Sequence, residues 1–149
     1  MNHATVAPPW SYTLHLPHDP RSPGVARAGL RAVLQAHGLS GLTATGEVLL
    51  SELATNAYLH STGPYTVQVR GAGRGRVRLS VWDGNPEIPP PFFGRAVPDQ
   101  TADSLSAERG RGLRIVAMCA DRWGAWSTVD RPCGRAGKVL WVEYVVKDE

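Results

Sequence analysis

The sequence predicts an α+β fold, a two-layer sandwich in which helices cover one face of a mixed, mainly antiparallel sheet. Two segments between residues 22 and 60 carry apolar residues at helical spacing and follow each other directly. The segments with strand-like alternation come mostly in pairs joined by short connections, which is typical of hairpins. Paired helices and hairpin strands favour a largely antiparallel sheet with one covered face over a doubly wound parallel sheet.

The 149 residues suffice for one domain with its own hydrophobic core. Residues 1–9 show no periodicity and are expected to be a flexible leader, so the single domain is expected to span 10–149. Its first strand is indicated by apolar residues that alternate with polar ones, namely Trp10, Tyr12, Leu14 and Leu16. The first helix is expected to have Ser22 as its cap and Pro23 at its first position, and to end at Gly38.

A second helix is expected from about Thr43 to about His60, with a glycine and a proline beyond it as a stop. Its apolar stripe consists of Val48, Leu49, Leu53 and Ala57. Two alternating strands, 65–70 and 77–82, follow and are joined by a glycine-rich turn. The two helices should pack together against the sheet that this hairpin begins.

A long loop is expected between the hairpin and the next element. The stretch from Gly84 to Arg109 contains five prolines and little hydrophobic periodicity, so it cannot be a continuous helix. Loops of this length in a compact domain are uncommon and are usually either functional or disordered, and residues 84–109 are interpreted as a lid. A closing hairpin of 123–128 and 139–146 is expected at the end of the chain. Between the lid and this hairpin, a short buried helix is indicated by Leu113, Ile115, Val116, Met118 and Cys119.

Composition narrows the class of protein. The formal net charge of +3 is carried by arginines scattered along the chain, which only weakly favours anionic partners. The two cysteines form no CxxC pair, and no stretch approaches the roughly 18 apolar residues of a membrane span. A cytoplasmic protein without a membrane segment is expected. No aromatic platform or recognition helix accompanies the arginines of the 70–76 turn, so direct nucleic-acid binding is not expected.

Polar residues form a row on the second helix. Glu52, Asn56 and His60 recur at intervals of four, which places a carboxylate, an amide and an imidazole on one helical face. Taken alone, such a row is also typical of a solvated helix face.

Two further segments could contact a nucleotide. Asp83 and Gly84 follow an apolar strand, where a carboxylate can accept a hydrogen bond from an exocyclic amine and glycine lets a base approach; an ordinary turn is the alternative. Gly110, Arg111, Gly112 and Leu113 begin a helix, where backbone N–H groups attract phosphate; a flexible connection is the alternative.

Together, Glu-Leu-Ala-Thr-Asn-Ala at 52–57, Val-Trp-Asp-Gly at 81–84 and Gly-Arg-Gly-Leu at 110–113 resemble the three boxes of the histidine-kinase-like (GHKL) ATPases. Within that superfamily the chain most resembles bacterial anti-sigma-factor serine/threonine kinases, over roughly residues 10–146. The resemblance implies the Bergerat ATP-binding fold.

The resemblance also implies roles for single residues. Glu52 would be the general base, and Asn56 would offer its side-chain oxygen to Mg²⁺ on the triphosphate. Asp83 would accept the adenine amine beside Gly84, and the segment Gly110, Arg111, Gly112 and Leu113 would hold the phosphates of ATP. The implied partners are an anti-sigma-factor antagonist, phosphorylated on serine or threonine, and a sigma factor, with a homodimer as a further expectation.

The chain departs from the family pattern at two places. The second box usually continues as Asp-x-Gly, whereas Asn85 and Pro86 follow Gly84 here. A late strand often supplies a threonine beneath the adenine, and Val139 is expected near that point. The altered box favours an alternative function, a partner-binding regulatory module without catalysis, whereas Glu52 favours the kinase.

Overall fold

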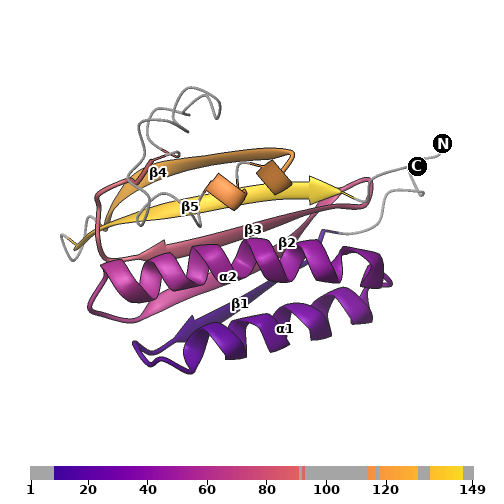
Figure 1. Ribbon diagram of the computed structural model, residues 1–149, viewed down its shortest axis with the longest axis horizontal. Helices are drawn as coiled ribbons and strands as arrows, with labels where there is room; N and C mark the ends of the chain where they lie inside the picture. Colours follow the sequence, from indigo (N-terminus) through magenta and orange to yellow (C-terminus); the bar gives the residue numbers. More distant parts are fainter. Residues whose placement is uncertain (1–8, 91, 93–113, 117, 131–134, 146–149) are drawn as a thin grey trace.

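The computed structural model describes residues 9–90, 92, 114–116, 118–130 and 135–145. Two α-helices lie on one face of a five-stranded sheet with the strand order β1-β2-β3-β5-β4 (Figure 1). Each neighbouring pair of strands is antiparallel, so the predicted α+β sandwich is confirmed, with a sheet that is antiparallel throughout the described strands. The elements are β1 (Ser11–Leu16), α1 (Ser22–Ala36), the 3-10 turn η2 (Ser40–Leu42), α2 (Thr43–His60), β2 (Tyr65–Gly73), β3 (Arg76–Asp83), β4 (Arg122–Asp130) and β5 (Arg135–Val145).

The helix α2 has the predicted bounds, but the predicted cap of α1 is wrong. Ser22 lies within the first turn of α1, and its hydroxyl donates a hydrogen bond to the carbonyl oxygen of Pro17 at 2.8 Å. The N-cap position is held by Arg21, which makes no side-chain capping bond. The backbone N–H of Ser22 is satisfied instead by the carbonyl oxygen of Asp19 at 2.9 Å. The serine hydroxyl thus bonds to the preceding chain rather than to its own helix.

Both predicted hairpins are present, with longer strands than expected. The turn between β2 and β3 is tight, and it has positive φ values at Gly73, Arg74 and Gly75, of 89°, 58° and 72°. A bulge between Gly71 and Gly73 precedes it. In the closing hairpin, β5 begins at Arg135, four residues before the predicted start at 139.

The segment after the lid is helical at residues 114–116 and 118–119, as predicted. Val116 is buried, but Met118 is 80% exposed, so the expectation that Met118 lies in the core is wrong. Of the predicted lid, the structure describes residues 84–90 and 92, and Phe92 is buried against the core. The rest of the lid lies outside the described residues.

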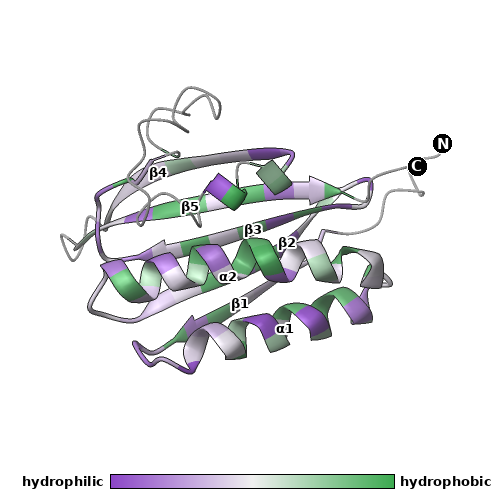
Figure 2. Ribbon diagram, viewed as in Figure 1, coloured by the Kyte–Doolittle hydropathy of each residue, from purple (hydrophilic) through white to green (hydrophobic). Residues whose placement is uncertain are grey.

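The hydrophobic core lies between the sheet and the two helices, and Figure 2 shows hydrophobic residues on both helices and on the central strands. Side chains of a strand alternate between its two faces, so every second residue of β3 and β5 faces the helices. These core-facing residues are Val77, Leu79 and Val81 of β3 and Leu140, Val142 and Tyr144 of β5. The same alternation carries Asp83 of β3 and Lys138 of β5 to the helix side of the sheet.

Gly46 of α2 lies directly against Tyr144 of β5. A Cβ atom there would collide with the hydroxyl of Tyr144 and would come within 3.0 Å of Leu30 Cδ2. That hydroxyl donates a hydrogen bond to the carbonyl oxygen of Leu42 at 3.0 Å, and burial raises the pKa of Tyr144, which keeps the hydroxyl a proton donor. The glycine therefore lets α2 approach the sheet.

We predict that Gly46→Ala destabilises the protein by about 1–3 kcal/mol, because overpacking outweighs the higher helix propensity of alanine. The matched control is Gly24→Ala in α1, where the nearest atom to an added Cβ, on the Arg27 side chain, is 3.5 Å away. Its stability should be unchanged or higher. Urea unfolding of the two variants measures the difference, and equal stabilities would refute the predicted collision.

Candidate functional site

The residues of the polar row on α2 differ in their exposure to solvent. Asn56 is 9% exposed, Glu52 is partly buried and His60 is exposed. The carbonyl oxygen of His60 accepts a hydrogen bond from Asn85 Nδ2 at 2.6 Å. This bond ties the end of α2 to the loop that follows β3, two residues beyond Asp83. Two of the three predicted motifs are thereby linked.

Asn56 carries an unsatisfied buried acceptor. Its Oδ1 atom has no hydrogen-bond donor among the described residues, although the atom is inaccessible to solvent. Leaving a buried acceptor without a partner costs about 1–3 kcal/mol, and native proteins rarely tolerate this without a functional reason. A side-chain amide oxygen is also a ligand that Mg²⁺ accepts. The donor chemistry at Asn56 therefore fits the predicted magnesium ion.

Glu52 lies one helical turn before Asn56 on the same face of α2. Burial raises the pKa of the Glu52 carboxyl above its ordinary value, because desolvation disfavours the charged form. A carboxylate with a raised pKa takes up protons more readily near neutral pH, which is what general-base catalysis requires.

Asp83 is held by a residue that the sequence interpretation missed. In the β3–β5 register Asp83 lies opposite Lys138, and each residue is 1% exposed. Lys138 Nζ contacts Asp83 Oδ1 at 2.9 Å and also donates to the carbonyl oxygen of Asn85 at 3.0 Å. The backbone N–H of Asn85 donates to the same Asp83 Oδ1 at 2.8 Å. The predicted adenine acceptor thus forms a buried ion pair within the sheet, and Oδ1 receives two donors.

Val139 was expected beneath the adenine near Asp83, and this expectation is wrong, because the residue opposite Asp83 is Lys138. Val139 lies opposite Trp82 of β3 and Trp126 of β4, and it therefore points to the face of the sheet away from the helices. Lys138 occupies the position beside Asp83 on the helix side. A signal for this was present in the sequence, because Lys138 shares the alternation of the apolar residues Leu140 and Val142.

Gly84 lies at a hollow of about 450 Å³ between the α2–β2 connection and the end of β3. Residues 60–64 line one side of this hollow, and Trp82 and residues 84–86 line the other. The predicted phosphate-binding residues Gly110, Arg111, Gly112 and Leu113 lie outside the described residues. Within the described part, α2 offers a buried amide oxygen and a carboxylate with a raised pKa, and the end of β3 offers a paired carboxylate. None of these three side chains lines the hollow at Gly84.

Comparisons with known proteins identify a family and a solved structure of the same fold. The sequence matches the model of the histidine kinase-like ATPase domain over residues 16–143. No curated protein gives a significant match. A chain in the crystal structure of the SiaB-SiaC complex from Pseudomonas aeruginosa has the same fold, with a TM-score of 0.61 at 15% identity and 89% of each chain covered. Neither helix in the described part of the chain has the length and apolarity needed to span a bilayer.

Proposed function

The chain belongs to the family of histidine kinase-like ATPase domains, and on that premise we propose that it is an ATP- and Mg²⁺-binding regulatory kinase. Its proposed reaction is transfer of the γ-phosphoryl group to a serine or threonine of an anti-sigma-factor antagonist in the cytoplasm, which would control a sigma factor. The resemblance of the three boxes to anti-sigma-factor kinases supports the substrate class. The solved neighbour is described as a complex of two proteins, which supports a protein partner.

Each site residue has a proposed task. Asn56 binds Mg²⁺ through its side-chain oxygen, and Asp83 accepts the adenine amine next to Gly84. Gly110, Arg111, Gly112 and Leu113 hold the phosphates through backbone N–H groups and a guanidinium. Glu52 accepts the proton of the attacking serine or threonine hydroxyl. Bound Mg²⁺-ATP supplies the phosphoryl group and the metal charge that stabilises it during transfer.

The observation that carries the nucleotide proposal is the unsatisfied Oδ1 atom of Asn56, buried one turn from Glu52. A structural asparagine in a hydrophobic core would be bonded to its neighbours. A bound cation would supply the partner that Asn56 Oδ1 lacks among the described residues.

We predict that Mg²⁺-ATP at about 100 times its dissociation constant stabilises the protein by roughly 2.7 kcal/mol. In a thermal-shift measurement this corresponds to a rise of roughly 5–10 °C for a domain of this size. Asn56→Ala should lose most of this shift. In the absence of ligand, this variant also loses the cost of its unsatisfied acceptor, which offsets part of the lost packing.

The matched control is Thr55→Ala, the exposed neighbour of Asn56 on α2, which should keep the full shift. Omitting Mg²⁺ should reduce the wild-type shift to the level of Asn56→Ala. A wild-type protein that shows no shift with Mg²⁺-ATP would refute nucleotide binding. An equal shift in Asn56→Ala would refute the role of its oxygen.

One observation favours the alternative function, a regulatory module that binds its partner without catalysis. Lys138 and the backbone of Asn85 both donate to Asp83 Oδ1, so a base would have to use the other oxygen of this carboxylate. In that case the protein would bind its partner tightly without phosphorylating it.

A further inference from the structure

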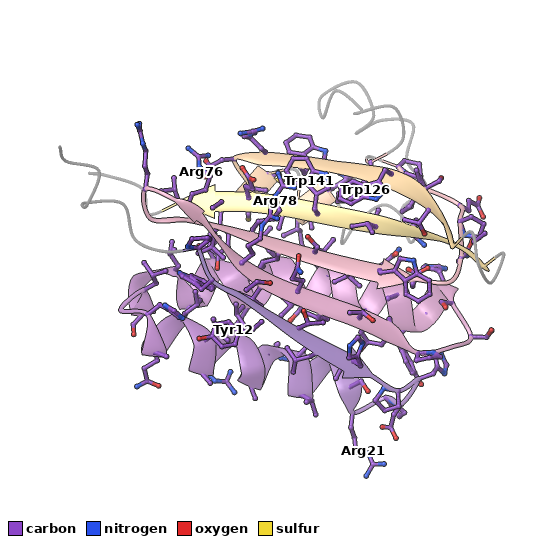
Figure 3. All side chains as sticks on the ribbon, turned by 180° about the vertical axis from the view of Figure 1, so that it is seen from behind. Tyr12, Arg21, Arg76, Arg78, Trp126 and Trp141 are labelled. Atoms are coloured by element: carbon purple, nitrogen blue, oxygen red, sulfur yellow. The ribbon has the colours of Figure 1, made fainter. Side chains whose placement is uncertain are left out.

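The face of the sheet away from the helices carries arginines and tryptophans, and in Figure 3 this face is turned toward the viewer. We call it the Arg-Trp face. Among the described side chains it is defined by Arg70, Arg76, Arg78, Arg122, Trp82, Trp126 and Trp141. These residues come from four neighbouring strands, β2, β3, β5 and β4, so they form one continuous surface rather than scattered points.

Positive charge gathers at one end of this face. The strand registers align Arg70, Arg78, Glu143 and Arg122 in a single row across the sheet. Arg78 contacts Glu143 Oε2 through Nη2 at 2.6 Å, and Arg122 lies 3.5 Å from Oε1 of the same carboxylate. Glu143 is the one carboxylate among the described side chains of the face. Its single negative charge stands against four guanidinium groups, so the face has an excess of positive charge.

Two of the tryptophans, Trp82 and Trp141, are held in place beside the arginines. A Cβ atom on Gly124 would collide with the ring of Trp141, and one on Gly137 would collide with the ring of Trp82. Each ring therefore lies across a glycine on a neighbouring strand. The guanidinium of Arg78 covers Trp141 at 4.0 Å, and Trp82 Nε1 donates to Thr128 Oγ1 at 3.0 Å. Binding a partner here costs little side-chain entropy because these rings are already fixed.

We propose that the Arg-Trp face is a docking surface for an acidic segment of a protein partner. Guanidinium groups bind carboxylates with two parallel hydrogen bonds, and arginine and tryptophan are enriched among residues that dominate protein interfaces. Arg122 and Trp126 are 61% and 46% exposed, so a cation and a ring are open to a partner.

The structure favours a protein over a nucleic acid or a second copy of the chain. Binding of single strands relies on several exposed rings on which successive bases stack. Trp126 is the one strongly exposed tryptophan in the described part of the chain, because Trp82 and Trp141 lie against the sheet. A second copy would bring the same excess of positive charge to the interface, and like charges in contact disfavour association.

The docking surface and the polar side chains of the proposed nucleotide site lie on opposite faces of the sheet, although Trp82 also lines the hollow at Gly84. Trp82 and Asp83 are neighbours on β3 but point to opposite faces, as do Val139 and Lys138 on β5. Glu52 and Asn56 belong to α2, which covers the opposite face of the sheet (Figure 1). The acidic segment should therefore bind with or without Mg²⁺-ATP, and this docking can be tested even if the protein binds no nucleotide.

The test uses a fluorescein-labelled peptide of alternating glutamate and leucine and follows its anisotropy with the full-length chain. Binding should weaken about fivefold or more in Trp126→Ser and in the double variant Arg70→Gln/Arg76→Gln, the range expected for interface residues that contribute strongly. The charge-matched control is Arg21→Gln/Arg31→Gln, which removes two positive charges from the helix side and should keep the affinity within about twofold.

Three results would overturn the proposal. The first is equal weakening by the helix-side control, which would indicate a net-charge effect. The second is tighter binding of oligothymidylate than of the acidic peptide, which would indicate a nucleic-acid surface. The third is a wild-type dimer in sedimentation that Trp126→Ser dissociates, which would indicate a second copy of the chain as the occupant.

A separate readout needs no variant. In the wild-type chain the bound peptide should protect tryptophan fluorescence from quenching by acrylamide, and unchanged quenching would count against docking at this face.

Discussion

Lys138→Met is expected to lower the free energy of unfolding by about 3–5 kcal/mol, the cost of removing one partner from a buried ion pair. Lys138 and Asp83 are each 1% exposed, and their charged atoms lie 2.9 Å apart. Methionine fills much of the volume of lysine but leaves the carboxylate of Asp83 without its counter-charge in the interior. Chemical denaturation of the wild type and the variant measures the loss as a lower midpoint concentration, with the same slope of unfolding free energy against denaturant concentration.

The matched control is Arg31→Met on α1, which breaks the ion pair between Arg31 and Glu47. That pair is as short, at 2.8 Å, but the Arg31 side chain is 52% exposed. Its loss should cost less than about 1 kcal/mol because water already screens the charges. Adding Asp83→Asn to Lys138→Met should recover part of the stability, because it removes the unpaired charge. Equal costs for Lys138→Met and Arg31→Met would contradict the importance of burial here.

The contrast between α2 and the start of α1 shows what local sequence determines. The α2 helix has its predicted bounds, because the apolar residues of 48–57, about three turns, and the stop at Gly63 and Pro64 act locally. Val48 was wrongly counted in the buried stripe, since it is 42% exposed. The cap of α1 was mispredicted because the hydroxyl of Ser22 has a choice of acceptors, and the chain fold brings the Pro17 carbonyl within reach. Periodicity thus predicts which elements form, whereas the hydrogen bonds at their ends depend on tertiary contacts.

The candidate site divides in the same way. The positions of Glu52 and Asn56 on one face of α2 follow from helical spacing alone. Lys138 was missed because its partner Asp83 is 55 residues away in the chain, and no local pattern specifies that β3 pairs with β5. The alternation of Lys138 with buried residues of β5 did mark it as a core-facing lysine, which requires a buried counter-charge.

Glu52→Gln is expected to reduce phosphoryl transfer to the protein partner by about 10²–10⁴-fold, the usual contribution of a general base. Glutamine keeps the shape of the side chain and cannot accept the hydroxyl proton. The stabilisation of the protein by Mg²⁺-ATP should be preserved, because Glu52 is assigned to proton transfer and not to nucleotide binding. Incubation with labelled ATP and an anti-sigma-factor antagonist, the proposed substrate, gives the rate. Glu47→Gln on the same helix is the control, with near wild-type transfer expected.

The raised pKa of Glu52 adds a pH signature to this prediction. Below that pKa the carboxyl holds a proton and cannot accept another, so transfer should fall on acidification with a midpoint above the ordinary glutamate value of about 4.3. A raised pKa in the folded state also means that the ionised form opposes folding. Glu52→Gln should therefore stabilise the protein near neutral pH, by less than about 1 kcal/mol for a partly solvated group, and this gain should vanish below about pH 4, where glutamate is protonated in both states. If Glu52→Gln transferred phosphate at the wild-type rate while gaining this stability, Glu52 would be a buried acid without a role as general base. If the wild-type protein transferred no phosphate, the partner-binding module would be the better description of the protein.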